Sequence, residues 1–169
     1  MVTIALRAAR QAGEMIVKAA DNLDSVQVSE KSKNDFVTEI DKRSEEMIID
    51  TISKAYPDHH FLSEESGFRG SDSSDIQWII DPLDGTTNFV HGIPYVSVSI
   101  ACIIKGELEH AVVVEPFSHD EFTASRGSGT RLTGRRIRVS GKTEKEGALY
   151  ATGIPFNDPS FKNMSEYLN

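Results

Sequence analysis

The sequence has little cysteine and no long apolar stretch, and each shortage excludes a class of protein. A single cysteine among 169 residues, Cys102, forbids an internal disulfide and suits a reducing compartment. The longest apolar run, Ile100 to Ile104, is far shorter than the roughly 20 residues that cross a bilayer. The first residues also lack the apolar stretch of a secretion signal, so we expect a cytoplasmic chain of one domain, with Cys102 in its core.

Basic residues are scarce as well, and they are unevenly distributed. Lys and Arg number 18 against 26 Asp and Glu, which gives a formal net charge of −8. Residues 1–85 hold 9 basic and 17 acidic side chains, whereas residues 86–169 hold 9 of each. An acidic half is typical either of a solvated surface or of carboxylates gathered to hold cations.

Apolar periodicity predicts two amphipathic helices in the first third of the chain. Residues 3–22 repeat apolar side chains at i, i+3, i+4 and i+7. The second helix begins near Thr38, where Thr38 and Asp41 resemble a capping box, and Pro57 marks its end. The polar segment Ser29–Asp35 between them is predicted to be an exposed loop. The stripe expected to be buried on the second helix consists of Val37, Ile40, Met47, Ile48, Thr51, Ile52 and Ala55.

After residue 57 the period changes from 3.6 to 2, which predicts strands. The expected strands are Phe61–Glu64, Ile76–Asp81, Tyr95–Ile104, Leu108–Glu115, Glu121–Ser125, Ile137–Ser140 and Leu149–Thr152. Short polar turns at Lys105–Glu107 and Thr133–Arg135 favour antiparallel hairpins. Two helices followed by a run of strands predict an α+β fold, with the helices packed on a largely antiparallel sheet.

The chemistry is concentrated in the run from Trp78 to Phe89. An apolar strand ends on Asp81, and Pro82 at the second position of a turn would bring Asp81 and Asp84 together. Two carboxylates so close repel unless a cation or a proton lies between them. The following Gly85–Thr87 offers backbone N–H groups and hydroxyls to a phosphate.

Carboxylate and carbonyl oxygens suit Mg²⁺, and Glu64 or Glu65 at the end of an earlier strand would add a further ligand. Two such ions about 3.5–4 Å apart activate a water and steady the leaving oxygen of a phosphate ester. For Asp-Pro-x-Asp-Gly taken alone, an ordinary turn with an Asx-type cap is an equal alternative.

Four motifs together carry a family resemblance over the whole chain. They are Asp35 to Asp41, Glu64-Glu65-Ser66, Trp78 to Phe89, and Arg126 to Gly129. In these the sequence resembles the inositol monophosphatase family, most of all its bacterial inositol-1-monophosphatases. The resemblance implies a homodimeric, lithium-sensitive enzyme that uses Mg²⁺ to hydrolyse a small phosphate monoester, first of all myo-inositol 1-phosphate. Sugar bisphosphates, histidinol phosphate and nucleotide bisphosphates stay open as substrates.

The same resemblance implies a role for each matching residue. The metal ligands would be Glu64, Asp81, the carbonyl of Leu83, and Asp84. The groups that prepare the attacking water would be Glu64, Thr86 and Asp41. The substrate would be held by Asp84, Gly85, Thr86 and Thr87. The segment Ser29–Asp35 would close over the site, with Lys31 or Lys33 near the phosphate.

One departure from the family pattern concerns the second metal ion. The resemblance implies a further α/β domain whose Trp-Asp pair supplies the last carboxylate of that site. Here the single tryptophan, Trp78, precedes Ile79, and the sequence ends at Asn169. We therefore expect residues 1–169 to be the N-terminal metal- and phosphate-binding domain, with the second metal site incomplete.

A second function class comes from a basic segment. Residues 123–143 contain six basic side chains and no acidic one. This segment is either a solvated hairpin edge, where charge discourages strand pairing, or a contact surface for RNA or a transcription complex. It contains no aromatic residue, which argues against stacking on single-stranded bases. The residues of the expected contact are Arg131, Arg135, Arg136 and Arg138.

Overall fold

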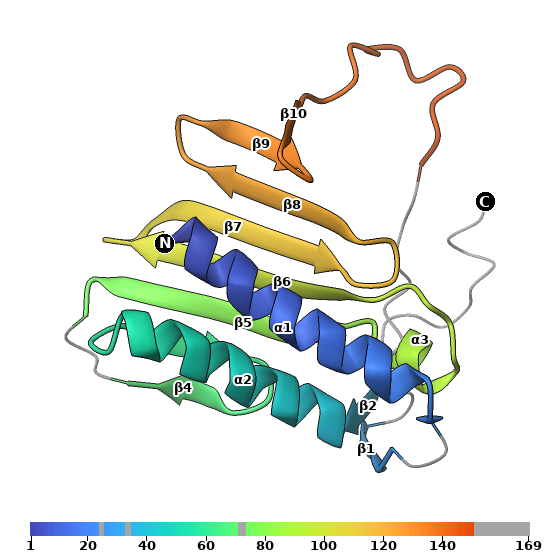
Figure 1. Ribbon diagram of the computed structural model, residues 1–169. Helices are drawn as coiled ribbons and strands as arrows, with labels where there is room; N and C mark the ends of the chain where they lie inside the picture. The colour runs from blue at the N-terminus through green and yellow to red at the C-terminus, as the bar shows by residue number, and fades with distance from the viewer. Residues whose placement is uncertain (24–25, 33–34, 71–73, 151–169) are drawn as a thin grey trace.

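The computed structural model describes residues 1–23, 26–32, 35–70 and 74–150. Two long helices, α1 (Val2–Ala20) and α2 (Glu39–Ala55), lie side by side across one face of a sheet (Figure 1). Helices followed by a mostly antiparallel sheet confirm the predicted α+β class. Among the described residues, no helix is both long enough and apolar enough to cross a membrane.

Helix α1 approaches the sheet closely because its buried stripe is made of small residues. Ala5, Ala8, Ala9 and Ala12 are each at most 1% exposed. At Gly13 an added Cβ would lie only 3.0 Å from the Cβ of Pro116, so a larger residue there would push the helix outward.

Helix α2 begins as predicted but buries a different face. Thr38 caps it, with both halves of the capping box to Asp41 present. Met47 and Thr51 are only half-buried, Ala55 is exposed, and Val37 precedes the helix, so the predicted stripe is wrong at these positions. The buried face consists of Ile40, Asp41, Ser44, Glu45, Ile48, Ile49 and Ile52. Polar side chains occupy the inner side of the first two turns because they form hydrogen bonds with the segments of the candidate site.

Among the described residues, the main sheet has eight strands in the order β10-β9-β8-β7-β6-β5-β3-β4. The strands are β3 (His60–Ser63), β4 (Gly67–Arg69), β5 (Ile76–Asp84), β6 (Ser97–Ile104), β7 (Glu107–Glu115), β8 (Asp120–Ser125), β9 (Gly129–Leu132) and β10 (Arg135–Ile137). Their pairing is antiparallel except between β3 and β5, which run parallel. The two predicted hairpin turns are present, with positive φ at Lys105-Gly106 and Thr133-Gly134.

Several sequence-based expectations need correction. The described part of the segment predicted as a loop belongs to β1 (Val28–Ser32) and β2 (Asp35–Thr38), which pair as a separate antiparallel ribbon; residues 33 and 34 lie outside the described residues. Strands β4 and β9 were not predicted, because three or four residues beside glycine carry too little period to detect. The strand predicted at Ile137–Ser140 is wrong beyond Ile137. Leu149 and Tyr150 lie outside any strand, and the rest of that predicted strand falls outside the described residues.

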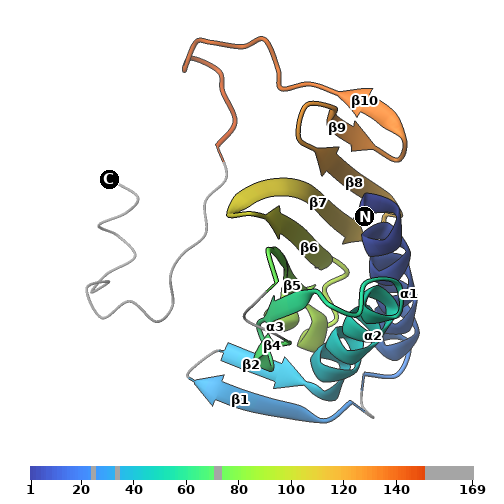
Figure 2. The ribbon, with the colours of Figure 1, turned by 90° about the vertical axis from the view of Figure 1, so that its left-hand side faces the viewer.

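The core lies between the helices and the inner face of the main sheet (Figure 2). Alternate residues of β5 and β6 point into it, among them Trp78, Ile80 and Cys102, so the predicted core position of Cys102 is confirmed. The remaining residues of these strands point to the opposite face, which we call the outer face. Leu62 and Ile79 on the outer face are 42% and 37% exposed.

Candidate active site

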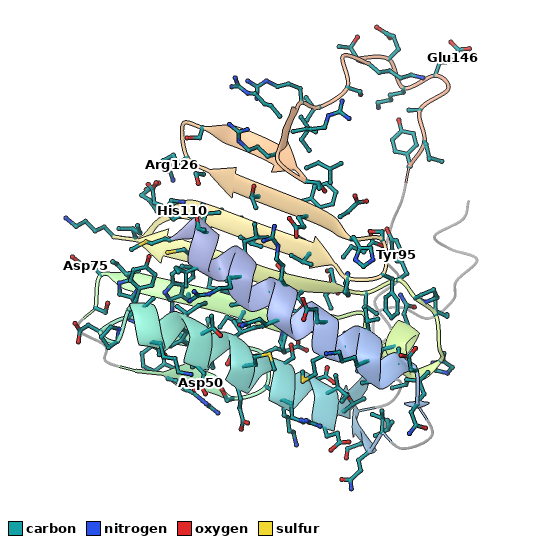
Figure 3. The ribbon with its side chains drawn as sticks, in the orientation of Figure 1. Asp50, Asp75, Tyr95, His110, Arg126 and Glu146 are labelled. Carbon is teal, nitrogen blue, oxygen red and sulfur yellow. The ribbon has the colours of Figure 1, made fainter. Side chains whose placement is uncertain are left out.

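Three segments far apart in sequence meet at one end of the main sheet. They are the first turns of α2, the residues that follow β3, and the junction between β5 and the short helix α3 (Thr86–Val90). Tyr95, labelled in Figure 3, lies at the same end. The chemistry depends on how these three segments orient their side chains.

A β-bulge near the end of β5 brings two carboxylates to the same face. Asp81 pairs with Ser99 and Asp84 with Ser97, so β5 has one residue more than β6 between these pairs. In a regular strand, residues three apart point to opposite faces, whereas the extra residue returns Asp84 to the outer face with Asp81. The predicted turn at Pro82 is therefore wrong: the strand continues, and proline is tolerated at the bulge.

Glu64 lies beside Asp81 because β3 and β5 run parallel to this point. The Glu64 N–H donates to the carbonyl of Ile80 over 3.1 Å, one residue beyond the end of β3. Burial, followed by the charges of Glu64 and Asp84, raises the pKa of Asp81 to about 7. A hydrogen bond shared with Glu64 also contributes to this raised pKa, and one from the Leu83 backbone opposes the rise. Two carboxyl groups share a hydrogen bond only when one is protonated.

The position next to Asp81 Oδ1 is suited to a cation. Asp81 Oδ1 is buried and has no hydrogen-bond partner among the described residues, which is costly for a charged oxygen. A divalent ion would satisfy this oxygen, replace the proton and relieve the repulsion from the two neighbouring carboxylates. In the described ranges, however, no three acidic, His or Cys side chains form a closed ligand set. The residues fit a cation at Asp81 without showing its coordination shell.

Three buried polar side chains of α2 hold the acidic segments in place. Asp41, Ser44 and Glu45 are each at most 2% exposed. The Ser44 hydroxyl donates to the Pro82 carbonyl over 2.8 Å, at the bulge. The Glu65 N–H donates to Glu45 Oε2 over 2.9 Å, which anchors the residue after Glu64. Sequence reasoning missed Ser44 and Glu45. Their signal was polar residues at i+3 and i+4 from Asp41, within an otherwise apolar stripe.

The predicted pair of Thr86 and Asp41 is in contact across 45 residues of sequence. The Thr86 hydroxyl lies 2.9 Å from Asp41 Oδ1 and 3.0 Å from the Leu83 carbonyl. Asp41 is held by its other oxygen, Oδ2, which accepts from the Thr38 N–H over 2.8 Å. The hydroxyl has one proton, so it donates fully to only one acceptor at a time. If the Leu83 carbonyl binds a cation, Asp41 remains as the acceptor for Thr86.

Gly85 joins the strand to α3 in a conformation that other residues rarely adopt. Its φ is +96°, and an added Cβ would lie 3.2 Å from the Tyr95 carbonyl oxygen. The Asn88 amide donates to that same carbonyl over 2.8 Å. Asp84 and Thr87, on either side of the Gly85–Thr86 step, are exposed and accessible to a ligand.

Two hollows flank the acidic residues on the outer face. One, of about 370 Å³, is lined by residues of β3, β5 and β6 that include Glu64, Asp81 and Ser99. The other, of about 290 Å³, is lined by Asp84, Gly85 and their neighbours. A larger hollow of about 700 Å³ lies between α1 and α2, on the opposite side of the sheet from these carboxylates. Lys31 belongs to β1, and Lys33 lies outside the described residues.

Comparison with known proteins agrees with this arrangement. Residues 1–166 match the inositol monophosphatase family. The chain belongs to that family. A relative from Pseudomonas aeruginosa named Nus factor SuhB is 54% identical over 171 residues, covering 100% of this chain and 63% of its own length. This agrees with the resemblance of the motifs to the bacterial SuhB type.

Solved structures of family members share the fold. The extragenic suppressor protein suhB from Bartonella henselae superposes with a TM-score of 0.81 at 41% identity, over 83% of this chain and 54% of its own. The Thermotoga maritima inositol monophosphatase gives a TM-score of 0.73 at 39% identity, over 80% and 52% of the two chains. The chain thus spans less than two thirds of the length of these relatives.

Proposed function

We propose that this chain takes part in the Mg²⁺-dependent hydrolysis of a small phosphate monoester, with myo-inositol 1-phosphate as the first candidate. The observation that carries the proposal is the buried, unpartnered Oδ1 of Asp81 beside Glu64 and Asp84. Membership of the inositol monophosphatase family and the named phosphatases among the structural neighbours support it.

In this proposal the acidic residues hold the metal and the polar residues prepare the water. Mg²⁺ would be held by Glu64, Asp81, Asp84 and the Leu83 carbonyl, and would supply positive charge to the phosphate and lower the pKa of water. Asp41 keeps the Thr86 hydroxyl oriented, and Thr86 with Glu64 positions the water that attacks phosphorus. Gly85 and Thr87 would receive the phosphate oxygens next to Asp84. Because a metal-held water can attack phosphorus directly, the proposal includes no covalent intermediate on the protein.

The substrate class is tested by phosphate release with a panel of esters. One neighbour, 28% identical, is titled inositol monophosphatase-fructose 1,6 bisphosphatase, so both activities belong in the panel. We expect release from myo-inositol 1-phosphate that requires Mg²⁺ and is inhibited by lithium. Preferred release from fructose 1,6-bisphosphate, histidinol phosphate or a nucleotide bisphosphate would reassign the substrate. No Mg²⁺-dependent release from any ester would refute the phosphatase proposal.

The number of bound metal ions is a separate part of the proposal. We propose that residues 1–169 form the metal- and phosphate-binding part of the protein, with the last ligand of a second ion supplied from elsewhere. The intact mass of the purified polypeptide, compared with 18.7 kDa for this sequence, tests this together with Mg²⁺ stoichiometry. One ion at 18.7 kDa and two in a longer chain or dimer are expected. Two ions in an 18.7 kDa monomer would contradict it.

A second candidate is a regulatory binding role in transcription. Relatives that match the whole chain carry the name Nus factor SuhB. The exposed residues proposed for this role are Arg131, Arg135, Arg136 and Arg138. Neutralising Arg135, Arg136 and Arg138 together should weaken binding to a purified transcription complex while phosphate release stays intact. Unchanged binding would show that these arginines do not bind the transcription complex.

A further inference from the structure

The hairpin of β9 and β10 forms the edge of the main sheet farthest from α2 (Figures 1 and 2). Arg131 and Arg136 are direct cross-strand partners in this hairpin. Their side chains therefore lie on one face, about 4.5–5.5 Å apart at Cβ. Arg138 lies one residue beyond the end of β10, two residues after Arg136. The hairpin thus presents a short ladder of guanidinium groups.

Two of these guanidinium groups converge over one glycine. A Cβ built on Gly129 would lie 2.9 Å from Arg138 Nη1 and 3.7 Å from Arg136 Nη2. Like charges so close repel, which is unfavourable unless an anion lies between them. Among the described residues, Arg136 and Arg138 form no ion pair with a carboxylate.

Three acidic residues of β7 and β8 are already paired with other arginines. Arg10 of α1 forms a two-pronged ion pair with Glu121 of β8, and this contact lowers the pKa of Glu121. Arg126 pairs with Glu107 and with Glu109 at 2.8 and 3.0 Å. Neither pair leaves a carboxylate for the hairpin.

The ladder extends towards α1. Arg7 is exposed and lies one turn before Arg10, which contacts β8. Thr123 of β8 is the register partner of Arg131, so a hydroxyl points to the same face. Basic and hydroxyl donors therefore line a surface that runs from α1 across β8 to β10.

We propose that Arg131, Arg136 and Arg138, together with Arg7, bind the phosphodiester backbone of a nucleic acid. This assignment rests on the second function proposed above, the binding role, and specifies its ligand chemistry. A guanidinium donates two parallel hydrogen bonds to a phosphate, and a row of them matches a chain of phosphates. The site is separate from the acidic cluster, which lies on the outer face.

The surface favours a phosphodiester chain over an acidic peptide. A peptide would bind a sheet edge most readily as an added strand, and charged side chains on a three-residue edge strand oppose that. Residues 123–143 contain no aromatic side chain for stacking bases, so the contact would be with the backbone and independent of base sequence.

The test is fluorescence anisotropy with labelled 20-base-pair RNA and DNA duplexes at several salt concentrations. R136Q/R138Q should weaken duplex binding by about fivefold or more at 50 mM salt. On the DNA duplex, the slope of log K against log salt should fall by about 1.8, because two phosphate contacts are lost. R136K/R138K should keep most of the slope but lose affinity, since lysine cannot make the bidentate contact. Comparison of the two duplexes identifies which nucleic acid is preferred.

The matched control is R43Q/K54Q, which removes the same charge from the exposed side of α2. The proposed nucleic-acid site would be overturned if both double variants weakened duplex binding equally, or if R136Q/R138Q had no effect on it. Displacement of the duplex by polyglutamate at equal charge concentration would reassign the surface to acidic proteins. Asp84→Asn should bind the duplexes as tightly as the parent. Asp84→Asn therefore tests the phosphatase proposal and R136Q/R138Q tests the nucleic-acid site, so the two can fail independently.

Discussion

The protein gathers like charges in two places, and their different burial gives them different consequences. Glu64, Asp81 and Asp84 meet where strands end on the outer face, and burial is the largest cause of the raised pKa of Asp81. Arg136 and Arg138 meet at the sheet edge, where water surrounds them. Charge repulsion is strong in the partly buried cluster and screened in the exposed one.

This difference implies that the two sites depend on the fold in different ways. The carboxylates are held by the bulge and by polar side chains of α2, so their repulsion opposes folding until a proton or cation neutralises it. Arg136 is placed by strand register and Arg138 follows the end of β10. Neither forms an ion pair among the described residues, so a change there should affect ligand binding and little else. The following predictions test this contrast, from the largest expected effect to the smallest.

Removing the charge of Asp84 should abolish most phosphate release without unfolding the protein. Asp84 is exposed and accepts a hydrogen bond from the Ser97 hydroxyl over 3.3 Å, which Asn can also accept, so the substitution keeps the local structure. In the proposed mechanism the variant loses a metal ligand, and we expect turnover to fall at least 100-fold, or about 2.7 kcal/mol of transition-state stabilisation. Initial rates measure this, with Asp50→Asn on the exposed side of α2 as control (Figure 3). Near-normal turnover of Asp84→Asn would contradict the metal assignment.

Truncating Glu45 should destabilise the protein because a partly buried N–H loses its acceptor. Glu45→Ala removes the partner of the Glu65 N–H, and we expect a loss of about 1–3 kcal/mol in the free energy of unfolding. Glu46→Ala, on the exposed side of the same helix, should change it by less than about 0.5 kcal/mol. Urea unfolding compares the two, and Glu45→Gln, which keeps an acceptor, should recover part of the loss. Equal stability of the two alanine variants would show that the Glu45 contact does not support the fold.

Neutralising Asp81 should stabilise the metal-free protein at high pH only. The folded-state pKa of Asp81 is raised from 3.8 to about 7, so the folded state binds the proton more tightly and stability falls as pH rises through this window. A fully buried group would contribute about 4 kcal/mol, and partial exposure reduces this to about 1–2 kcal/mol.

Asp81→Asn should therefore unfold at a higher temperature than the parent at pH 8 and at the same temperature at pH 4. Mg²⁺ should raise the melting temperature of the parent at pH 8 and leave that of Asp81→Asn unchanged, because the variant lacks the charged ligand. Calorimetry in EDTA and in Mg²⁺ measures both effects. If Asp81→Asn were less stable than the parent at pH 8, burial and the neighbouring charges would not destabilise ionised Asp81.

Neutralising the hairpin should have the smallest effect on stability. R136Q/R138Q removes two exposed, mutually repelling charges, and we expect the free energy of unfolding to change by less than about 0.5 kcal/mol or to rise slightly. Thermal unfolding at low and high salt measures this, and the parent should gain more from added salt than the variant. A loss above about 1 kcal/mol would show that these arginines have structural partners.

Local sequence determined the elements whose cause lies within a few residues. The alanine-rich stripe of α1, the capping box of Thr38 and Asp41, and the glycine turns at Gly106 and Gly134 were all predicted from short-range patterns. The acidic motif around Asp81 was also visible, because Asp81 and Asp84 follow directly on an apolar stretch of sequence.

Only the tertiary structure decided how those residues meet. Pro82 predicted a turn, but pairing with β6 makes a bulge, which alone brings Asp81 and Asp84 to one face. Ser44 and Glu45 were missed because their burial depends on bonds to Pro82 and Glu65, and a helical pattern does not encode such partners. Strand register likewise sets Arg136 beside Arg131. Caps, turns and periodicity arise from neighbours in sequence, whereas a bulge, a buried hydrogen bond and a charge ladder arise from neighbours across strands.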